Sequence, residues 1–375
     1  MMKKIISLLL IIMIAVSMTG CADEITVDYE PFDYDSVNYV GTYTREYAGT
    51  SINVFNWGEY ISDGSEGTID VNKAFEKLTG VKVNYIFFDS NETMYTKLKG
   101  GGVSYDIVIP SDYMIARMKN EGMLRKLDFS KIDNYHFIDG KYKDLYFDPQ
   151  NEYSVPYNVG MVGVIYNTTV VKEEPDSWNI LWDEEYKNNI LTFNNPRDAF
   201  GTAQKLLGIS FNTTDKEEWQ AAADALKKQK SVLKSYVMDE IYDKMEIGEA
   251  AIAPYYAGDY LTMYDNNEDL AFFYPKEGTN IFVDSICIPN CSKNYEAALM
   301  YINFLLEPEI ALANAEYICY ASPNTSVINN EKYSYYKNEI LYPSEENLPE
   351  TEFYYDMDEE TKKLYESLWE DVKLY

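Results

Sequence analysis

Apolar and polar residues follow one another along the first half of this chain in a regular order of strand and helix. Short apolar or alternating runs indicate strands, and between them apolar residues recur at helical spacing. Ser90 is a candidate N-cap, and Gly80 and Gly122 are candidate left-handed helix stops. Strands are predicted at 52–55, 81–88 and 105–110, and helices at 69–78, 90–98 and 111–120. A strand–helix repeat of this kind predicts a parallel sheet.

The second half of the chain continues the same α/β pattern. A chain of 375 residues is too long for one small core and suits two lobes. Further strands are predicted at 161–166 and 250–256, and further helices at 217–228, 239–246, 295–306 and 359–372. The fold class expected from the pattern alone is therefore α/β.

Polar and aromatic residues follow each of the first three predicted strands. They are Trp57 to Tyr60, Asp89-Ser90 and Ser111 to Tyr113. Ligands of open parallel sheets bind beyond the carboxyl ends of the strands. Trp57 and Tyr60 offer ring faces beside a carboxylate, Glu59, and such faces attract organic cations by about 0.5–2 kcal/mol. The alternative is that Trp57 anchors the core and Tyr60 is a surface ring.

The charge of the chain narrows the choice of partner. It has 62 acidic residues against 32 basic ones, a net charge of −30. Nucleic acid and anionic membrane surfaces are repelled by such a protein, whereas a cationic solute is attracted. The acidity is equally compatible with a role in solubility alone. Because the chain has 36 Tyr, a single tyrosine is weak evidence for a site.

The N-terminus carries a targeting signal. Lys3 and Lys4 precede an apolar run from residue 5 to 16, which is too short for a permanent membrane span. The following Met-Thr-Gly-Cys resembles a bacterial lipobox, in which Cys21 is the lipidated first residue of the mature protein. Plain secretion is the alternative. We predict a signal peptide over 1–20, an acidic tether over 21–50, and a lipoprotein at the outer face of the cytoplasmic membrane or in the periplasm.

No metal or cofactor is expected. If Cys21 carries the lipid, three cysteines remain, Cys287, Cys291 and Cys319, and an odd number argues against a full set of disulfides. Cys287 lies in an alternating run typical of a buried strand. His136 is the chain's one histidine, so a zinc site is improbable. The glycines at 100–102 lack the Lys-Ser/Thr of a phosphate loop.

Two acids have unusual surroundings. Asp284 lies inside the apolar run IFVDSICIP, where a charge is costly unless it is paired. Asp259 follows an apolar strand and a glycine, at the point where the chain leaves a sheet. The structural alternatives are an internal salt bridge or N-cap for Asp284 and a solvated turn for Asp259.

From about Ser51 to the C-terminus the chain resembles the polyamine-binding proteins, which are spermidine/putrescine receptors of ABC importers. The resemblance lies in VFNWGEY, FDSNETMYTKLKGG, YDIVIPSDYM, EGMLRKLD, YSVPYNVGMVGVIYN, SWNILWDEEY, AIAPYYAGDY, YPKEGTNIFVDSICIP and YINFLLEPEIA. It implies a two-lobed periplasmic-binding-protein fold of type II, with a hinge and a ligand cleft between the lobes. It also implies that residues 51–157 and 284–327 form lobe 1 and that 158–283 and 328–375 form lobe 2.

The resemblance also implies roles for individual residues. Acids at the places of Asp284, Asp259 and Asp198 hold ligand nitrogens, with Glu59 a weaker candidate. Aromatic residues surround the methylene chain, and Ser111 makes a polar contact; the aromatic set is Trp57, Tyr60, Tyr113, Tyr256 and Phe282.

The chain departs from the spermidine-type members at several places. Tyr256 and Phe282 stand where those members have tryptophan, Asn195 stands where they have aspartate, and the family's amide contact is not evident near Tyr354. These departures leave the choice between diamine and triamine open. The combination of Asp259 and Phe282 points toward putrescine.

The expected function is therefore a solute receptor, with no catalytic residues and no cofactor. Its expected partners are a polyamine, the transmembrane subunits of an ABC permease, and the membrane through the N-terminal lipid; the protein is expected to be a monomer. The alternatives are a receptor of the same fold for a sugar, peptide or iron complex, an acid/base glycosidase, or a structural surface lipoprotein. A hydrolase triad is not expected, because no Ser or Cys has a nucleophile context.

Overall fold

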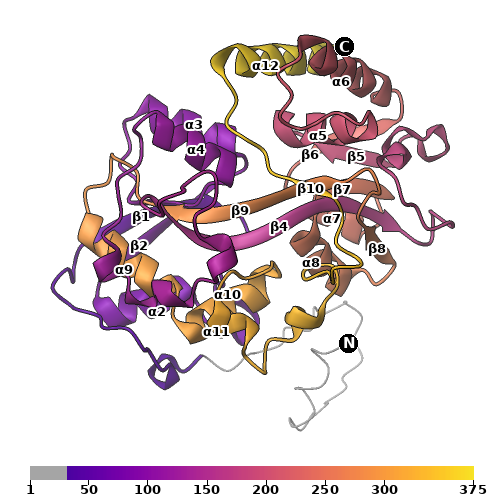
Figure 1. Cartoon of the computed structure of the whole chain (residues 1–375). Coiled ribbons are helices and arrows are strands. Elements are labelled where there is room, and N and C mark those ends of the chain that lie inside the picture. The colour runs from indigo at the N-terminus through magenta and orange to yellow at the C-terminus, as the bar shows by residue number, and fades with distance from the viewer. Residues whose placement is uncertain (1–31) are drawn as a thin grey trace, which may run out of the picture. The chain divides into compact units, whose positions relative to one another are not determined.

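The strands within residues 32–375 of the computed structural model join in one mixed sheet, in the order β2-β1-β3-β9-β4-β7-β5-β6, with β10 paired to β9 and β8 paired to β4 (Figure 1). The structure describes residues 32–375, so the predicted signal peptide and Cys21 lie outside the described residues and stay predictions. The strands are β1 (Ser51–Trp57), β2 (Lys82–Phe88), β3 (Ile107–Val108), β4 (Ser154–Asn167), β5 (Ile190–Phe193), β6 (Leu233–Val237), β7 (Ile252–Tyr256), β8 (Leu270–Phe273), β9 (Thr279–Cys287) and β10 (Thr351–Glu352).

The first lobe is built around β1, β2 and β3, which are parallel, as predicted. Its helices are α2 (Val71–Thr79), α3 (Asn91–Gly100) and α4 (Asp112–Asn120). The predicted caps are present: the Ser90 side chain accepts from the backbone N–H of Thr93, and Gly80 adopts a φ of 75°. Strand β1 continues two residues beyond its predicted end, because Trp57 pairs with Phe88 and its indole N–H donates to the carbonyl of Ile109 at 2.9 Å.

The second lobe is built around β5, β6 and β7, and β5 runs parallel to both of its neighbours. Its helices are α5 (Pro196–Leu206), α6 (Lys216–Gln229), α7 (Ile241–Glu246), α8 (Ala257–Asn266) and the terminal α12 (Glu359–Leu374). Helix α12 packs against α6, where the rings of Trp219 and Tyr365 stack 5.2 Å apart. The predicted helices and strand of this region are confirmed with small shifts of their ends.

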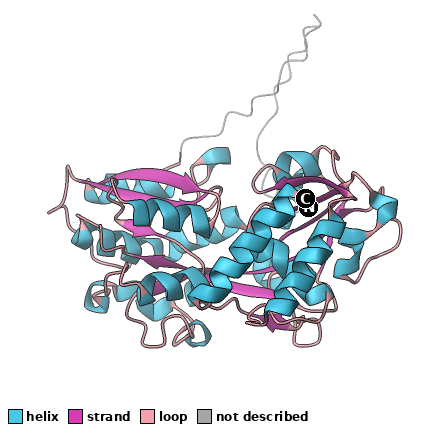
Figure 2. Ribbon diagram, turned by 90° about the horizontal axis from the view of Figure 1, so that it is seen from above, coloured by secondary structure: helices cyan, strands magenta, loops and turns pink. Residues whose placement is uncertain are grey.

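Two long antiparallel strands, β4 and β9, run from one lobe into the other (Figure 1), and the two lobes lie side by side in the view from above (Figure 2). The predicted strand 161–166 is the second half of β4, whose residues are all buried. The register of the pair shifts between Pro156 and Asn158, and beyond the shift Asn158 lies opposite Asp284. Cys287 ends β9 as a buried strand cysteine, as predicted. The exact lobe boundaries stay predictions.

The segment after β9 consists of α9 (Tyr295–Leu305), α10 (Pro308–Ile318) and the short α11 (Thr325–Ile328). These helices lie beside the first lobe in Figure 1. Within residues 32–375 no helix is both long enough and apolar enough to span a bilayer.

The described part of the predicted tether is not a loose linker. Glu307, which is fully buried, accepts hydrogen bonds from the backbone N–H groups of Val40 and Gly41, both at 2.7 Å, and from the hydroxyl of Tyr43. Asn134 donates to the same carboxylate at 2.9 Å. The tether prediction for 21–50 therefore needs correction for residues 40–43. Acidic composition and the lack of a period suggested a linker, but a distant carboxylate supplies the partners that fix this segment.

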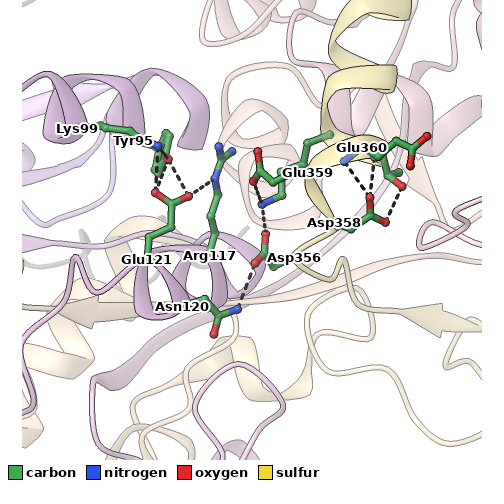
Figure 3. A network of polar contacts seen from close by, with 11 residues as sticks. Tyr95, Lys99, Arg117, Asn120, Glu121, Asp356, Asp358, Glu359 and Glu360 are labelled. Carbon is green, nitrogen blue, oxygen red and sulfur yellow. Dashed lines mark hydrogen bonds and ion pairs between the residues drawn. The ribbon is translucent and has the colours of Figure 1, made fainter.

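Polar contacts connect α4 to the C-terminal segment (Figure 3). Glu121, just after α4, pairs with Lys99 at 3.1 Å and with Arg117 at 3.2 Å. The Asn120 side chain donates to Asp356 at 3.2 Å, and Asp356 also pairs with Lys362 of α12 at 2.8 Å. These contacts tie the first lobe to the segment that leads into the terminal helix.

Candidate ligand-binding site

A narrow cavity lies between the two lobes, where the carboxyl ends of β1, β2 and β7 meet β9. The centres of water-sized molecules can occupy about 80 Å³ of it. Every residue that the sequence analysis named as ligand-binding lines this cavity: Trp57, Glu59, Tyr60, Ser111, Tyr113, Asp198, Tyr256, Asp259, Phe282 and Asp284. The structure thus brings these residues together; their part in binding stays a prediction.

Asp284 is the most buried acid of the cavity, with 3% of its surface exposed. The hydroxyl of Tyr60 donates to its Oδ2 at 2.6 Å, and Oδ1 has no hydrogen-bond partner within the described chain. Burial raises the pKa of Asp284 to about 6, although the Ser111 and Tyr60 hydroxyls act in the opposite direction. Asp284 lies in mid-strand rather than at a helix start, so it is not an N-cap.

Asp259 lies in the first turn of α8 and is held by two phenols. Tyr242 donates to its Oδ1 at 2.7 Å, and Tyr320 donates to its Oδ2 at 3.0 Å. Burial raises the pKa of Asp259 to about 7. The preceding glycine is required, because a Cβ on Gly258 would lie 2.1 Å from Cδ2 of Tyr320. The interpretation of Asp259 as a solvated turn residue is therefore wrong.

A second pair of acids, Asp198 and Glu92, shares another part of the cavity. Tyr256 donates to Asp198 at 2.6 Å, and the side-chain amide of Asn195 donates to it at 2.8 Å. Tyr113 donates to Glu92 at 2.9 Å. Burial raises the pKa of both carboxyls, and the charge of Asp198 raises that of Glu92 further.

Aromatic rings form much of the rest of the wall. Tyr60 meets Tyr320 edge to face, with ring centres 5.3 Å apart, and Tyr256 meets Phe282 in the same way at 5.5 Å. The Phe282 ring lies on Gly160, where a Cβ would approach it to 2.3 Å. Trp57 is half-buried against Phe88, so it serves the core and the cavity together.

Two of the predicted residues have a more peripheral place. Glu59 is exposed, has a positive φ of 49°, and accepts from the hydroxyl of Tyr317 at 3.2 Å. The hydroxyl of Ser111 accepts from the side chain of Asn91 at 3.0 Å. Glu59 therefore lies near the opening of the cavity, and Ser111 forms part of a buried polar contact behind it.

Several lining residues were missed by the sequence analysis. They include Glu92, Asp239, Tyr242, Tyr255, Tyr320 and Tyr354. Asp239 comes two residues after β6, and Glu92 lies in the first turn of α3, just after the loop that follows β2, so the position of both acids near strand ends was a usable signal. The tyrosines carried no local signal in a chain so rich in tyrosine. Tyr354 does line the cavity, although the amide expected at its place is absent.

The chemistry of the lining is that of a receptor for a cation. Within the described chain no lysine, arginine or histidine lines the cavity. Its buried acids accept from tyrosine hydroxyls, which are neutral donors that support a carboxylate without cancelling its charge. No cluster of His, Cys, Asp or Glu in residues 32–375 is arranged to hold a metal ion.

Comparisons with known proteins agree with this geometry. Residues 104–340 match the model of a family described as bacterial extracellular solute-binding protein. The spermidine/putrescine-binding periplasmic protein of Salmonella typhimurium is 35% identical over 321 residues, which cover 85% of this chain and 90% of that protein.

Solved structures give the same result for the fold. The spermidine/putrescine ABC transporter substrate-binding protein PotD from Streptococcus pneumoniae is 37% identical, with a TM-score of 0.72 over 87% of this chain and 99% of that chain. A structure from Listeria monocytogenes is 38% identical, with a TM-score of 0.82 over 87% of this chain and 100% of that chain. These likenesses confirm the two-lobed periplasmic-binding-protein fold. The chain belongs to the bacterial extracellular solute-binding proteins.

Proposed function

We propose that this protein is an extracytoplasmic receptor that binds a polyamine, putrescine or spermidine, between its lobes and delivers it to the permease of an ABC importer. The observation that carries this proposal is the cavity lining, in which buried carboxylates are bonded to phenols and no basic residue of the described chain takes part. The names of the similar proteins from Salmonella typhimurium and Streptococcus pneumoniae support it.

The geometry suggests how a polyamine is held. Its ammonium groups pair with Asp284, Asp259 and Asp198, and its methylenes lie against Trp57, Tyr60, Tyr256 and Phe282. Burial of the methylenes contributes about 25 cal/mol per Å² of apolar surface removed from water. Unpaired carboxylates in a closed cavity are costly, so a cation between the lobes favours the closed state over the open one.

The net charge of −30 supports capture of the ligand from solution. Electrostatic steering of this kind raises association rates by about 10- to 1,000-fold at low ionic strength. Binding contacts from both lobes are needed before the closed form can dock on the permease. This chain is proposed to act without catalysis, as a monomer attached to the membrane through a lipid on Cys21.

Thermal unfolding with a set of small solutes tests the proposal. A ligand at 100 times its Kd stabilises the folded state by about 2.7 kcal/mol, so putrescine, cadaverine and spermidine should raise Tm by several degrees. Neutral sugars and peptides should leave Tm unchanged. A rise with a sugar or an iron complex, and none with any polyamine, would replace this proposal by the rival receptor. Release of a reducing end from a glycan would indicate a glycosidase.

The lipid attachment needs a separate experiment. Mass spectrometry of protein purified from membranes should find a diacylglycerol-modified Cys21 at the mature N-terminus. The variant Cys21→Ser should be recovered in the soluble fraction. An unmodified residue 21 in the wild-type protein would favour plain secretion.

A further inference from the structure

Arg197 is a buried cation in a receptor whose ligand cavity is otherwise acidic. It is the second residue of α5, between Asn195 and Asp198, and only 3% of its surface is exposed. Its Nε, Nη1 and Nη2 atoms have no hydrogen-bond partner within residues 32–375. A charge in such a position costs several kcal/mol unless something compensates it, so its presence needs a physical reason.

Three tyrosine rings surround the guanidinium. Its carbon lies 4.5 Å from the ring centre of Tyr354, 5.6 Å from that of Tyr113 and 5.7 Å from that of Tyr365. Each such cation–π contact stabilises the charge by about 2 kcal/mol when it is shielded from water. Tyr354 and Tyr113 also line the cavity, whereas Arg197 does not. The guanidinium therefore lies one aromatic layer behind the cavity wall.

The acids in front of this layer are Asp198 and Glu92. Burial raises the pKa of both carboxyls, and the charge of Arg197 opposes that rise in part. The other groups that face Asp198 are Asn195 on its own helix, Tyr256 on β7, Tyr354 on the C-terminal segment, Glu92 on α3 and Asp284 on β9. Glu92 faces Tyr113 of α4 as well. Arg197 is the one cation in this set.

We propose that Arg197 is a positioning residue that keeps Asp198 and Glu92 ionised together and so gives this end of the cavity a net charge of about minus one. Two facing carboxylates without a cation would share a proton, because like charges in a buried site suppress each other's ionisation. With the guanidinium of Arg197 behind them, both carboxylates stay charged, and this end of the cavity accepts one ammonium group. The statement about the ligand's ammonium group rests on the proposed function. The statement that Asp198 and Glu92 are both ionised does not depend on it.

The first experiment therefore uses the ligand-free protein. Carboxyl ¹³C resonances of Asp198 and Glu92, assigned with Asp198→Asn and Glu92→Gln, are followed against pH in the wild type and in Arg197→Met. Methionine keeps most of the side-chain volume without the charge. We expect the midpoint of at least one acid to rise by about 1 pH unit in Arg197→Met, the lower end of the usual effect of an opposite charge, because a layer of rings separates the guanidinium from the acids. Arg197→Lys should return the midpoint toward the wild-type value.

Arg117→Met is the matched control. Its guanidinium also lies over a tyrosine, Tyr95, at 4.0 Å, but pairs with Glu121 outside the cavity. This variant should leave the midpoints of Asp198 and Glu92 unchanged. If Arg197→Met lowers Tm and leaves both midpoints at their wild-type values, Arg197 only stabilises the packing of the C-terminal segment and the inference is wrong. If Arg197→Met does not fold, the same comparison is made with Arg197→Gln and Arg197→Lys, where only the glutamine variant should shift the midpoint.

The second experiment measures protons released on binding. Titration calorimetry of putrescine at pH 7 in two buffers of different ionisation enthalpy gives that number. Arg197→Met should release up to one proton more per ligand than the wild type, because an acid protonated in the free receptor must ionise to pair with the ammonium. An equal number in both proteins contradicts the charge-setting role. Absence of polyamine binding in the wild type itself would overturn the proposed function, while the carboxyl titration would still decide the role of Arg197.

Discussion

The hydroxyl of Tyr60 donates a 2.6 Å hydrogen bond to Oδ2 of Asp284 and leaves Oδ1 of that acid without a hydrogen-bond partner in residues 32–375. Tyr60 follows β1 in the first lobe, and Asp284 lies on β9, which runs between the lobes. The phenol fixes one oxygen, and the other remains for an ammonium group. A similar arrangement recurs at Asp198, where Tyr256 and Asn195 both donate to Oδ2. At Asp259 both oxygens accept from phenols, Oδ1 from Tyr242 and Oδ2 from Tyr320.

Replacement of Asp284 by asparagine should weaken polyamine binding by about tenfold or more, since an ammonium would then be buried beside a neutral amide. Calorimetry in the wild type and in Asp284→Asn measures the change. Asp176→Asn, which removes an exposed acid with 72% of its side chain accessible, is the control and should keep the wild-type Kd. An unchanged affinity in Asp284→Asn would remove this residue from the binding model.

Polyamine affinity should fall as the pH is lowered from about 8 to about 5. Burial raises the pKa of Asp259 to about 7 and that of Asp284 to about 6 in the ligand-free protein, and a nearby ammonium lowers both. The bound state therefore holds fewer protons, and binding strengthens with rising pH. Calorimetry between about pH 5 and about pH 8, one unit below the lower and one unit above the higher of these pKa values, measures the profile. The profile of Asp259→Asn should be flatter near neutral pH.

The stability of the ligand-free protein should have the opposite pH dependence. The pKa of Asp259 is raised from about 3.9 in the unfolded chain, so its stabilising contribution is complete below that value and is lost as the pH rises through about 7. Tm of the wild type relative to Asp259→Asn should therefore decrease from about pH 4 to about pH 7 and change little above that. Parallel curves for the two proteins would show that Asp259 has an ordinary pKa.

The variant Gly258→Ala should weaken both the fold and the site. A Cβ there would lie 2.1 Å from Tyr320, so the ring must move and its 3.0 Å bond to Asp259 is lost. Overpacking of this kind costs about 1–3 kcal/mol of the free energy of unfolding, and loss of the bond should lower affinity by about fivefold.

A matched control is available at the end of α3. A Cβ on Gly100 meets nothing within 4 Å, so Gly100→Ala should leave the Kd unchanged and the stability equal or slightly higher. Urea unfolding and calorimetry of the two variants give both quantities. Equal Kd values for Gly258→Ala and Gly100→Ala would show that Tyr320 does not need its observed position for binding.

Glu307→Gln should release the segment at residues 40–43. The carboxylate accepts from two backbone N–H groups, the Tyr43 hydroxyl and Asn134, and an amide places a donor where one acceptor oxygen is needed. We expect a loss of about 1–3 kcal/mol in the free energy of unfolding and faster proteolysis before residue 50. The control Glu309→Gln alters an acid that accepts a longer bond, 3.3 Å, from Asn38. Similar proteolysis of both variants would show that Glu307 does not hold this segment.

The predicted elements are those with strong local signals. Helices α3 and α6 have caps and apolar spacing, and their ends were found within a few residues. Strand β4 was found only in part, because all of its residues are buried and it has no alternation to mark its length. Residues 40–43 were taken for a linker because their partner, Glu307, is more than 260 positions away.

The candidate site was predictable where residues directly follow strands. Trp57 ends β1, and Tyr60 and Ser111 follow parallel strands whose ends meet at one edge of the sheet, so their convergence follows from topology. Tyr320 reaches Asp259 from a segment that follows α10, and no local pattern connects the two. Arg197 is next to Asp198 in the sequence, but its proposed role can be recognised only from the three tyrosines, distant in sequence, that pack around it.

The register shift between Pro156 and Asn158 places the irregular part of the β4–β9 ladder opposite Asp284. The acid proposed to hold the ligand's charge thus lies on the strand pair that joins the lobes, next to its one irregular step. A designer who wishes to change selectivity without altering the opening and closing rates should therefore leave these two strands untouched and vary only side chains carried by α5, α7 and α8.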